Sequence, residues 1–189
     1  MRIFLAIIIL CFSLQSLTKA DDIRDFQIEG MSIGDSALDF FAETTIMSGL
    51  NVSYNDDSFY GREIKIDSDT YESISLTFKK NDEKFIIYQI KGMVYLNFDK
   101  CLKKKEIVIS QIKEILQNQI ENSYRGQYDK AYGESFAEVT DLKINGGFIR
   151  VWCDTFDKNF ERTKNWKDTL SVDASSEEYG EWLNNKAYK

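Results

Sequence analysis

Acidic side chains are the residues of this sequence best suited to chemistry, because the 189-residue chain has 31 Asp and Glu but no His. Without imidazole, His-activated nucleophiles and His-ligated zinc, iron or haem are excluded. Two carboxylates at a suitable separation can still hydrolyse a glycosidic bond, one as the acid and the other as the base or nucleophile. The candidates at the ends of predicted strands or in predicted loops are Asp56, Asp57, Glu63, Asp67, Asp69, Glu134, Glu138, Asp141 and Asp154.

No pair stands out among these carboxylates. With 31 acidic residues in the chain, some of them must lie close together by chance, and solvated surface charge is the simpler interpretation. A catalytic pair would need a cleft that shifts the pKa of at least one member. The sequence therefore assigns no catalytic residue.

Calcium is the metal that best suits an acidic chain without His, since its ligands are oxygen atoms. Three short runs offer such ligands, but none has the Asp-x-Asp-x-Asp-Gly spacing of an EF-hand loop. We therefore expect no metal site and no cofactor. The runs are Asn55 to Asp57, Asp67 to Asp69, and Asp154 to Asn159.

A stripe of tyrosines is the main aromatic pattern, with Tyr124, Tyr128 and Tyr132 at intervals of four residues. Such a stripe is able to bind a sugar or a peptide. The alternative is a helical connector whose rings pack over the core, and the spacing favours this interpretation. Gly126 and Gly133 interrupt the segment, so an unbroken helix is not expected there.

The first twenty residues have the pattern of a secretory signal peptide. Met1 and Arg2 precede an apolar run over residues 3–14, and Thr18 and Ala20 provide the small residues of a cleavage site before Asp21. The run is shorter than the ~20 residues of a membrane span. We therefore expect a periplasmic or secreted protein with no membrane span after cleavage.

The charge of the mature chain limits its partners. Loss of Arg2 and Lys19 lowers the 24 basic residues to 22, against 31 acidic residues, for a net charge of −9. This balance opposes nucleic-acid binding, which needs a basic surface. The cluster Lys103 to Lys105 is expected to be a solvated face near the start of a helix.

Cleavage also removes Cys11 and leaves two cysteines, Cys101 and Cys153. An even number of cysteines in an exported chain predicts a disulfide, and only one pairing is possible. The bond would stabilise the fold by up to about 4 kcal/mol through loop closure. A redox-active pair is the alternative, but neither cysteine has a C-x-x-C neighbour.

The first half of the mature chain predicts one helix and three strands. A turn at Gly30 to Gly34 leads to a helix that Asp35 or Ser36 caps and that ends near Met47. A polar loop follows, and then strand-like runs at residues 62–66, 71–79 and 84–98. The second run alternates apolar and polar residues, which predicts one face toward a core and one toward water. Gly92 is expected to mark a bulge.

The second half repeats this order. Residues 101–122 have the apolar periodicity of a long helix, and a connector at 124–133 follows. Strands are predicted at residues 136–144, 148–154 and 168–173, with a hairpin turn at Asn145 to Gly147. Ser175 and Glu178 have the spacing of a capping box for a terminal helix. Its buried side should carry Tyr179, Trp182 and Leu183.

Together these elements predict an α+β fold in a single domain, residues 21–189, with two similar halves at about 30–98 and 99–187. Each half is expected to be a helix-plus-three-strand unit of antiparallel sheet. The helices are expected to pack on one face of the sheet or sheets. The predicted disulfide, Cys101 to Cys153, would tie the long helix to the second hairpin.

The turn Gly30-Met31-Ser32, continued by Gly34 and Asp35, precedes a helix, a polar loop and three strands. Over residues 28–98 this order resembles small bacterial envelope proteins of the SmpA/OmlA (BamE-like) type and β-lactamase-inhibitor-like proteins. The chain lacks the Leu-Gly-x-Pro ending usual after that helix in the SmpA/OmlA type, and it lacks a lipobox. The resemblance implies a non-catalytic binding or assembly role in the cell envelope and carries over no site residue.

We therefore expect an exported, non-catalytic protein that binds another protein, a glycan or some other envelope component. The export signal, the absence of His and the absence of a catalytic motif favour this hypothesis. A carboxylate-dependent glycan or peptidoglycan hydrolase is one alternative. A secreted enzyme inhibitor, with an exposed apolar and aromatic patch, is another.

Overall fold

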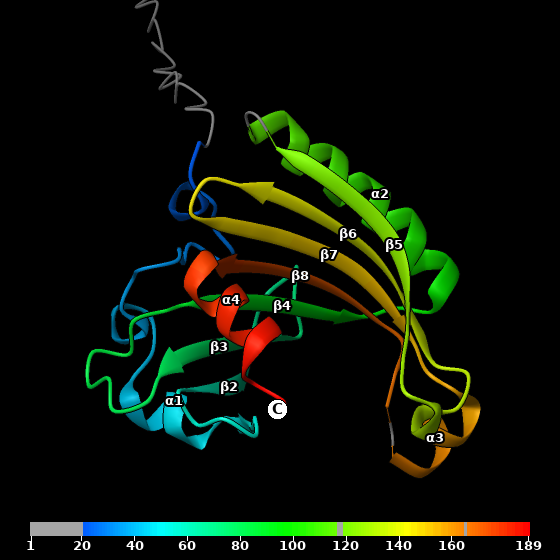
Figure 1. Ribbon diagram of the computed structural model, residues 1–189, viewed down its shortest axis with the longest axis horizontal. Coiled ribbons are helices and arrows are strands. Elements are labelled where there is room, and N and C mark those ends of the chain that lie inside the picture. Colours follow the sequence, from blue (N-terminus) through cyan, green and yellow to red (C-terminus); the bar gives the residue numbers. More distant parts are fainter. Residues whose placement is uncertain (1–20, 117–118, 165) are drawn as a thin grey trace, which may run out of the picture.

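The computed structural model describes residues 21–116, 119–164 and 166–189, so the predicted signal peptide lies outside the described residues. Eight strands form one antiparallel sheet, and four α-helices surround it (Figure 1). The strands are β1 Leu50–Val52, β2 Phe59–Lys65, β3 Ser73–Lys79, β4 Gln89–Tyr95, β5 Ile120–Gln127, β6 Phe136–Ile144, β7 Gly147–Thr155 and β8 Thr169–Ser176. The helices are α1 Glu43–Ser48, α2 Phe98–Ile115, α3 Lys158–Lys164 and α4 Glu177–Asn185, with 3-10 turns at Ile23–Asp25, Ala37–Asp39 and Lys130–Tyr132.

The strand order is β1-β2-β3-β4-β8-β7-β6-β5. The first four strands form one meander and the last four form another, and pairing of β4 with β8 joins them into a single sheet. The prediction of helix-plus-three-strand units is therefore wrong. Residues 50–52, assigned to no strand, form β1, and residues 120–127, assigned to the helix and connector, form β5.

Local sequence explains why β5 was not predicted. Its residues, IENSYRGQ, are mostly polar and lack the alternation of apolar and polar residues that marks a half-buried strand. All of them except Gly126 are exposed, so no apolar face is needed. The preceding helix, α2, also ends earlier than its pattern predicts, at Ile115. The predicted first helix is likewise shorter than expected, since a 3-10 turn at Ala37–Asp39 and the separate helix α1 replace it.

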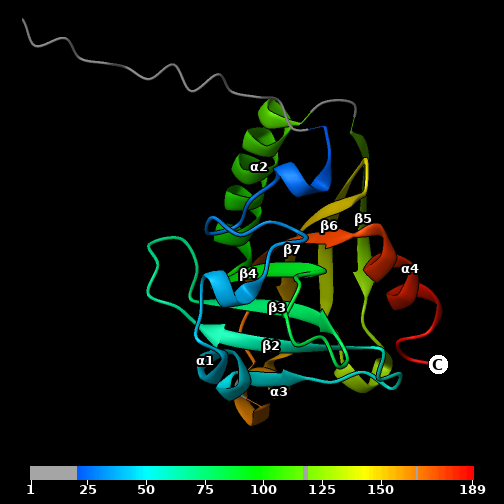
Figure 2. The ribbon, with the colours of Figure 1, turned by 90° about the vertical axis from the view of Figure 1, so that its left-hand side faces the viewer.

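The helices lie on both faces of the sheet, contrary to the expectation that they share one (Figure 2). Helix α2 packs against β7 and β8, and the disulfide between Cys101 and Cys153 joins it to β7 with a Cα–Cα distance of 5.9 Å. The main apolar core lies between α2, the N-terminal segment and this face. Its fully buried members include Ile74, Leu76, Ile90, Ile149 and Val151.

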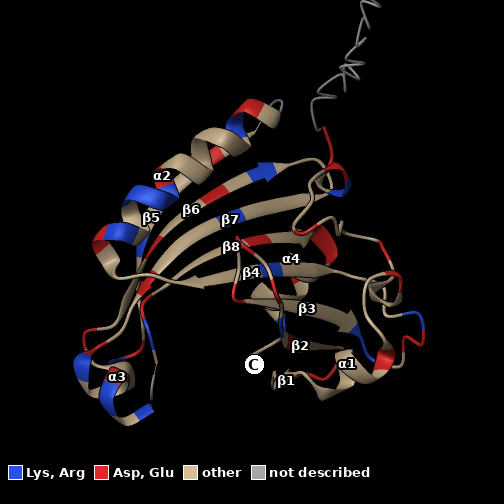
Figure 3. Cartoon of the chain, turned by 180° about the vertical axis from the view of Figure 1, so that it is seen from behind, with Lys and Arg blue, Asp and Glu red and all other residues tan. Residues whose placement is uncertain are grey.

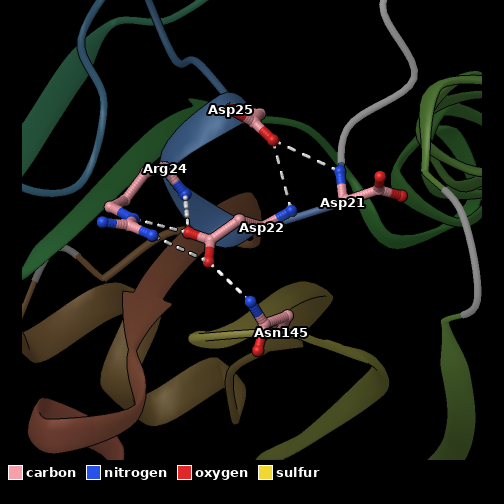
Figure 4. Close-up of polar contacts among 5 residues, drawn as sticks. All are labelled: Asp21, Asp22, Arg24, Asp25 and Asn145. Atoms are coloured by element: carbon pink, nitrogen blue, oxygen red, sulfur yellow. Dashed lines mark hydrogen bonds and ion pairs between the residues drawn. The ribbon is translucent and has the colours of Figure 1, made fainter.

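The N-terminal segment is held against the turn between β6 and β7 (Figure 4). Asn145 donates a side-chain hydrogen bond of 2.8 Å to Asp22, and the backbone N–H of Ile23 donates to the carbonyl of Asn145 at 2.9 Å. Arg24 forms an ion pair with Asp22 at 2.7 Å, which lowers the pKa of that carboxyl. The residues directly after the predicted cleavage site are therefore part of the fold.

The opposite face of the sheet is concave and is covered at one end by α4 and the C-terminus (Figure 1). Ser176 caps α4 by accepting a hydrogen bond from the N–H of Tyr179, one residue after the predicted start of the capping box. Tyr179 and Trp182 are buried as predicted, and they pack with Phe59 of β2 in a second apolar cluster. No helix among the described residues is long and apolar enough to cross a bilayer.

Both faces of β3 are buried, so the prediction that one face of this strand lies toward water is wrong. The polar side predicted to face water, Ser73, Ser75 and Thr77, is only 3%, 2% and 0% exposed. The sheet curves around this side (Figure 1), and two of these hydroxyls donate hydrogen bonds to neighbouring strands, Ser73 to Glu63 of β2 and Thr77 to Gln89 of β4. Gly92 likewise forms no bulge, because it pairs in regular register with Ile74 and Val172. The position requires glycine for another reason, since a Cβ there would lie 2.6 Å from the ring of Tyr71.

Candidate functional site

The concave face carries a row of side chains that runs straight across the sheet. Directly paired residues of neighbouring antiparallel strands point to the same side, so the pairing register places the row. We call this set the transverse row. It consists of Glu63, Ser75, Lys91, Asp173, Arg150, Asp141 and Asn122, contributed by β2, β3, β4, β8, β7, β6 and β5 in that order.

Charges of opposite sign alternate along the middle of the transverse row, where Lys91, Asp173, Arg150 and Asp141 follow one another. The alternation is visible as blue and red segments on neighbouring strands β4, β8, β7 and β6 (Figure 3). Arg150 donates two hydrogen bonds to Asp141, at 2.6 and 3.0 Å, in the bidentate geometry that favours strong pairing. This pairing raises the pKa of Arg150.

Asp173 is the most deeply buried carboxylate of the row, with 5% of its surface exposed. One of its oxygens accepts a hydrogen bond from Gln89 and the other accepts one from Ser175, both at 2.7 Å. Gln89 in turn accepts from the hydroxyl of Thr77 at 2.7 Å. Burial raises the pKa of Asp173, while these hydrogen bonds and the nearby Lys91 and Arg150 act in the opposite direction.

A second buried carboxylate, Asp154, lies at the end of β7 beside two aromatic side chains. Trp152 donates its indole N–H to one oxygen of Asp154 at 2.8 Å, and the hydroxyl of Tyr128 donates to the other. Burial raises the pKa of Asp154 against the effect of these hydrogen bonds. Burial of the Tyr128 hydroxyl next to this carboxylate also raises the pKa of Tyr128.

The α4 side of the concave face is aromatic as well. The hydroxyls of Tyr54 and Tyr179 are 2.8 Å apart and share a hydrogen bond. Tyr54 also packs edge-to-face on Trp182, with ring centroids 4.8 Å apart. Trp182 donates its indole N–H to Asp56 at 2.6 Å, and hydrogen bonds from Ser58 and then Trp182 lower the pKa of Asp56 to about 2.

Two adjoining hollows form a groove along this face. One has a volume of about 380 Å³, and its walls include Val52 of β1 and Tyr124 of β5, which lie at opposite edges of the sheet. The other, of about 460 Å³, lies between α4 and strands β5 to β7. Arg150 and Leu183 line both hollows, so we treat them as one groove. Six of the seven residues of the transverse row line this groove, and Glu63 lines neither hollow.

Lys91 differs from the other charged side chains of the transverse row, which all take part in hydrogen bonds with neighbouring side chains. Within the part of the chain that the structure describes, its ammonium forms neither a hydrogen bond nor an ion pair. The ammonium lies 6.0 Å from the centre of the Trp152 ring. The side chain is half-buried and lines the hollow of about 380 Å³.

The structure brings few of the predicted carboxylates together. Asp141 lines the groove, and Asp154 lies next to it. Glu63 belongs to the transverse row but accepts a hydrogen bond from Ser73 at 2.9 Å. The other six candidates lie in loops or on other surfaces, namely Asp56, Asp57, Asp67, Asp69, Glu134 and Glu138.

The structure also bears on the runs of oxygen ligands and on the tyrosine stripe that the sequence presents. Among residues 21–116, 119–164 and 166–189, no three acidic or Cys side chains cluster as metal ligands. Tyr124, Tyr128 and Tyr132 do not share a helix, because β5 ends at Gln127 and a 3-10 turn begins at Lys130. The helical-packing interpretation of the stripe is therefore wrong, and two of its members, Tyr124 and Tyr128, line the groove.

Asp173 was not among the residues selected from the sequence. The sequence nevertheless contains a pattern that could have indicated Asp173. Ser171, Asp173 and Ser175 alternate with Leu170, Val172 and Ala174 in the strand. Small hydroxyl residues on both sides of one carboxylate, all on one face of a strand, indicate a polar face that is closely packed. The sequence pattern does not show which residues pair with Asp173, because its neighbours Lys91 and Arg150 depend on the order of the strands in the sheet.

No protein-family model, curated protein or solved structure matches this chain. The resemblance of residues 28–98 to the SmpA/OmlA type and to β-lactamase-inhibitor-like proteins therefore stays a prediction. The groove on the concave face is the candidate functional site of the described residues.

Proposed function

We propose that this chain is an exported, non-catalytic binding protein that holds a segment of another protein in the groove of its concave face. The observation that carries the proposal is the groove itself, which crosses the sheet from edge to edge and has a polar floor and aromatic walls. Tyr and Trp at such a surface provide large contact areas with little loss of side-chain entropy. Inhibition of a secreted enzyme would be one form of this binding.

The state of the carboxylates supports binding rather than hydrolysis. Asp141, Asp154 and Asp173 each accept a hydrogen bond at both of their oxygens from neighbouring side chains. A glycosidase needs one carboxyl free to protonate the leaving group and a second facing the sugar or a water molecule. In Asp141, Asp154 and Asp173, hydrogen bonds within the protein already engage both oxygens that this chemistry would use.

The shape of the site supports a protein segment as the occupant. Strand β5 is at the edge of the sheet, pairs only with β6, and is exposed over most of its length. An unpaired edge beside a groove offers backbone hydrogen bonds to an extended segment, while the groove takes its side chains. The 40% exposed ring of Tyr124 lies on this edge and also lines the groove.

Two features support export. The signal-peptide pattern of residues 1–20 directs a chain out of the cytoplasm. The disulfide between Cys101 and Cys153 is of the kind that persists in oxidising compartments. The mature chain of residues 21–189 is therefore the form to test.

Site-specific photo-crosslinking tests the proposal. p-Benzoylphenylalanine replaces Tyr124 in one mature chain and Phe40, a similarly exposed ring outside the groove, in the control. In envelope extract, the chain labelled at position 124 is expected to form a discrete protein adduct, and the control is not. Adducts of equal yield at both positions, or binding of purified peptidoglycan with no protein adduct, would contradict the proposal.

A further inference from the structure

Lys91 lines the groove, so a role for it in binding rests on the proposed function. Every other charged side chain in the middle of the transverse row has a partner. Arg150 is paired with Asp141, and Asp173 uses its two oxygens for Gln89 and Ser175. Asp173 is next to Lys91 in the ladder and interacts with it through space.

The position of Lys91 makes its ammonium accessible to a ligand in the groove. Lys91 is in β4, within the strand pairing that joins the two meanders, and it lines the hollow of about 380 Å³. Ser75 pairs directly with Lys91 across β3 and β4 and lines the same hollow. An ammonium and a hydroxyl side by side offer hydrogen-bond donors to the two oxygens of one carboxylate.

Trp152 completes the site. Its ring lies on the other side of β8, 6.0 Å from the ammonium, and its indole N–H is already donated to Asp154. The ring is thus held in place and presents an apolar wall next to the cation. A charge-assisted hydrogen bond is stronger where a wall of this kind excludes water.

We infer that Lys91 is the anchor of an anion-binding subsite that binds a carboxylate of the bound segment, with Ser75 as the second donor and Trp152 as the apolar wall. The carboxylate comes either from an Asp or Glu side chain or from the C-terminus of the segment. Because the mature chain has a net charge of −9, its long-range field repels anions. Selection for the carboxylate therefore occurs through short contacts inside the groove.

Titration of small probes, followed by NMR of the ¹⁵N-labelled mature chain, tests this subsite. The probes are N-acetylglutamate α-amide for a side-chain carboxylate and N-acetylglycine for a chain terminus. The neutral probe is N-acetylglutamine amide, and inorganic phosphate is the fourth. The signals to follow are the Trp152 indole N–H and the Ser75 amide. At least one carboxylate probe is expected to bind at least about tenfold more tightly than the neutral probe.

Three variants accompany the titration. Lys91→Gln is expected to lower carboxylate affinity by at least about tenfold, and Lys91→Arg to retain it, since both cations donate to carboxylates. Lys104→Gln, an exposed lysine of α2 on the other face of the sheet, is the matched control and should behave as the wild type. Far-UV circular dichroism establishes that each variant is folded.

The outcomes separate this inference from the proposed function. Equal binding of the acidic and neutral probes, undiminished binding by Lys91→Gln, or binding of phosphate alone would overturn the subsite. The comparison of acid with amide uses the wild type and so does not depend on the folding of a variant. If the crosslink at position 124 forms while the carboxylate probes fail, the groove still binds protein and only the subsite is wrong.

Discussion

Gln89 donates a hydrogen bond of 2.7 Å to Asp173, and this contact joins β4 to β8. Those are the two strands whose pairing unites the meanders into one sheet. The same amide accepts from Thr77 of β3, so one side chain connects three neighbouring strands beneath the groove. Asp173 therefore contributes to the structure of the site, although it is an ionisable group in a closely packed environment.

Asp173→Asn should reduce the pH dependence of stability. Burial raises the pKa of Asp173 above its ordinary value of 3.8, so protonation favours the folded state. The stability gained in this way is present below the unfolded pKa and is lost as pH rises through the folded pKa. We expect the wild type to lose stability over that window and the variant to lose less. Urea unfolding from pH 4 to 8 measures the difference.

Asp69→Asn, at an exposed loop position, is the matched control for this substitution. Its urea midpoints should follow the wild-type curve at every pH. If Asp173→Asn also follows the wild-type curve, the pKa of Asp173 is not raised in the folded protein.

Tyr128→Phe should destabilise the fold by about 1–3 kcal/mol at neutral pH, because it leaves one oxygen of buried Asp154 without a donor. The loss should shrink as pH falls and Asp154 becomes protonated, since burial raises the pKa of that carboxyl. Tyr132→Phe is the control, because the Tyr132 hydroxyl has no hydrogen bond among the residues described. Equal effects of the two variants in chemical denaturation would refute a specific role for Tyr128.

Gly147→Ala should destabilise the hairpin of β6 and β7 by about 1–3 kcal/mol through overpacking. A Cβ at this position would lie 2.0 Å from the carbonyl oxygen of Ser175, which is backbone and has little freedom to move. Gly126→Ala in β5 is the control, since its Cβ would meet only the ring of Tyr124, at 3.8 Å. We expect the control to change the unfolding free energy by less than about 1 kcal/mol. A thermal or urea midpoint for Gly147→Ala equal to that of the control would show that β7 shifts freely.

Reduction of the disulfide should lower the free energy of unfolding by up to about 4 kcal/mol, because the bond closes a loop between residues 52 apart. Urea unfolding with and without dithiothreitol measures this loss. The double variant Cys101→Ala with Cys153→Ala should be less stable than the oxidised wild type and insensitive to the reductant. A reductant effect that persists in the double variant would mean that the measured loss does not come from this bond.

Features with local causes were predictable from the sequence. The Asn145 to Gly147 turn and the apolar stripe of α2 each involve residues close together in the chain, and both are present in the structure. The disulfide was predictable for a different reason, since the mature chain contains only two cysteines.

Features that depend on distant pairing were not predictable. Ser75 follows the pattern of a strand that faces water, yet curvature of the whole sheet buries it. Strand β5 has a polar sequence because most of it is exposed at an edge. The groove combines residues of seven strands and α4, and their proximity is specified only by the sheet order.

The pairing of β4 with β8 has a consequence for biosynthesis. Helices α2 and α3 and strands β5, β6 and β7 separate β4 from β8 along the chain, so the pairing of β4 with β8 is non-local and carries a large loop-closure entropy cost. A nascent chain that has emerged only as far as β7 has neither the strand that carries Asp173 nor the α4 wall of the groove. The proposed binding therefore requires β8 and α4, which follow the other strands of the groove in the chain, so an unfinished chain would lack the proposed site.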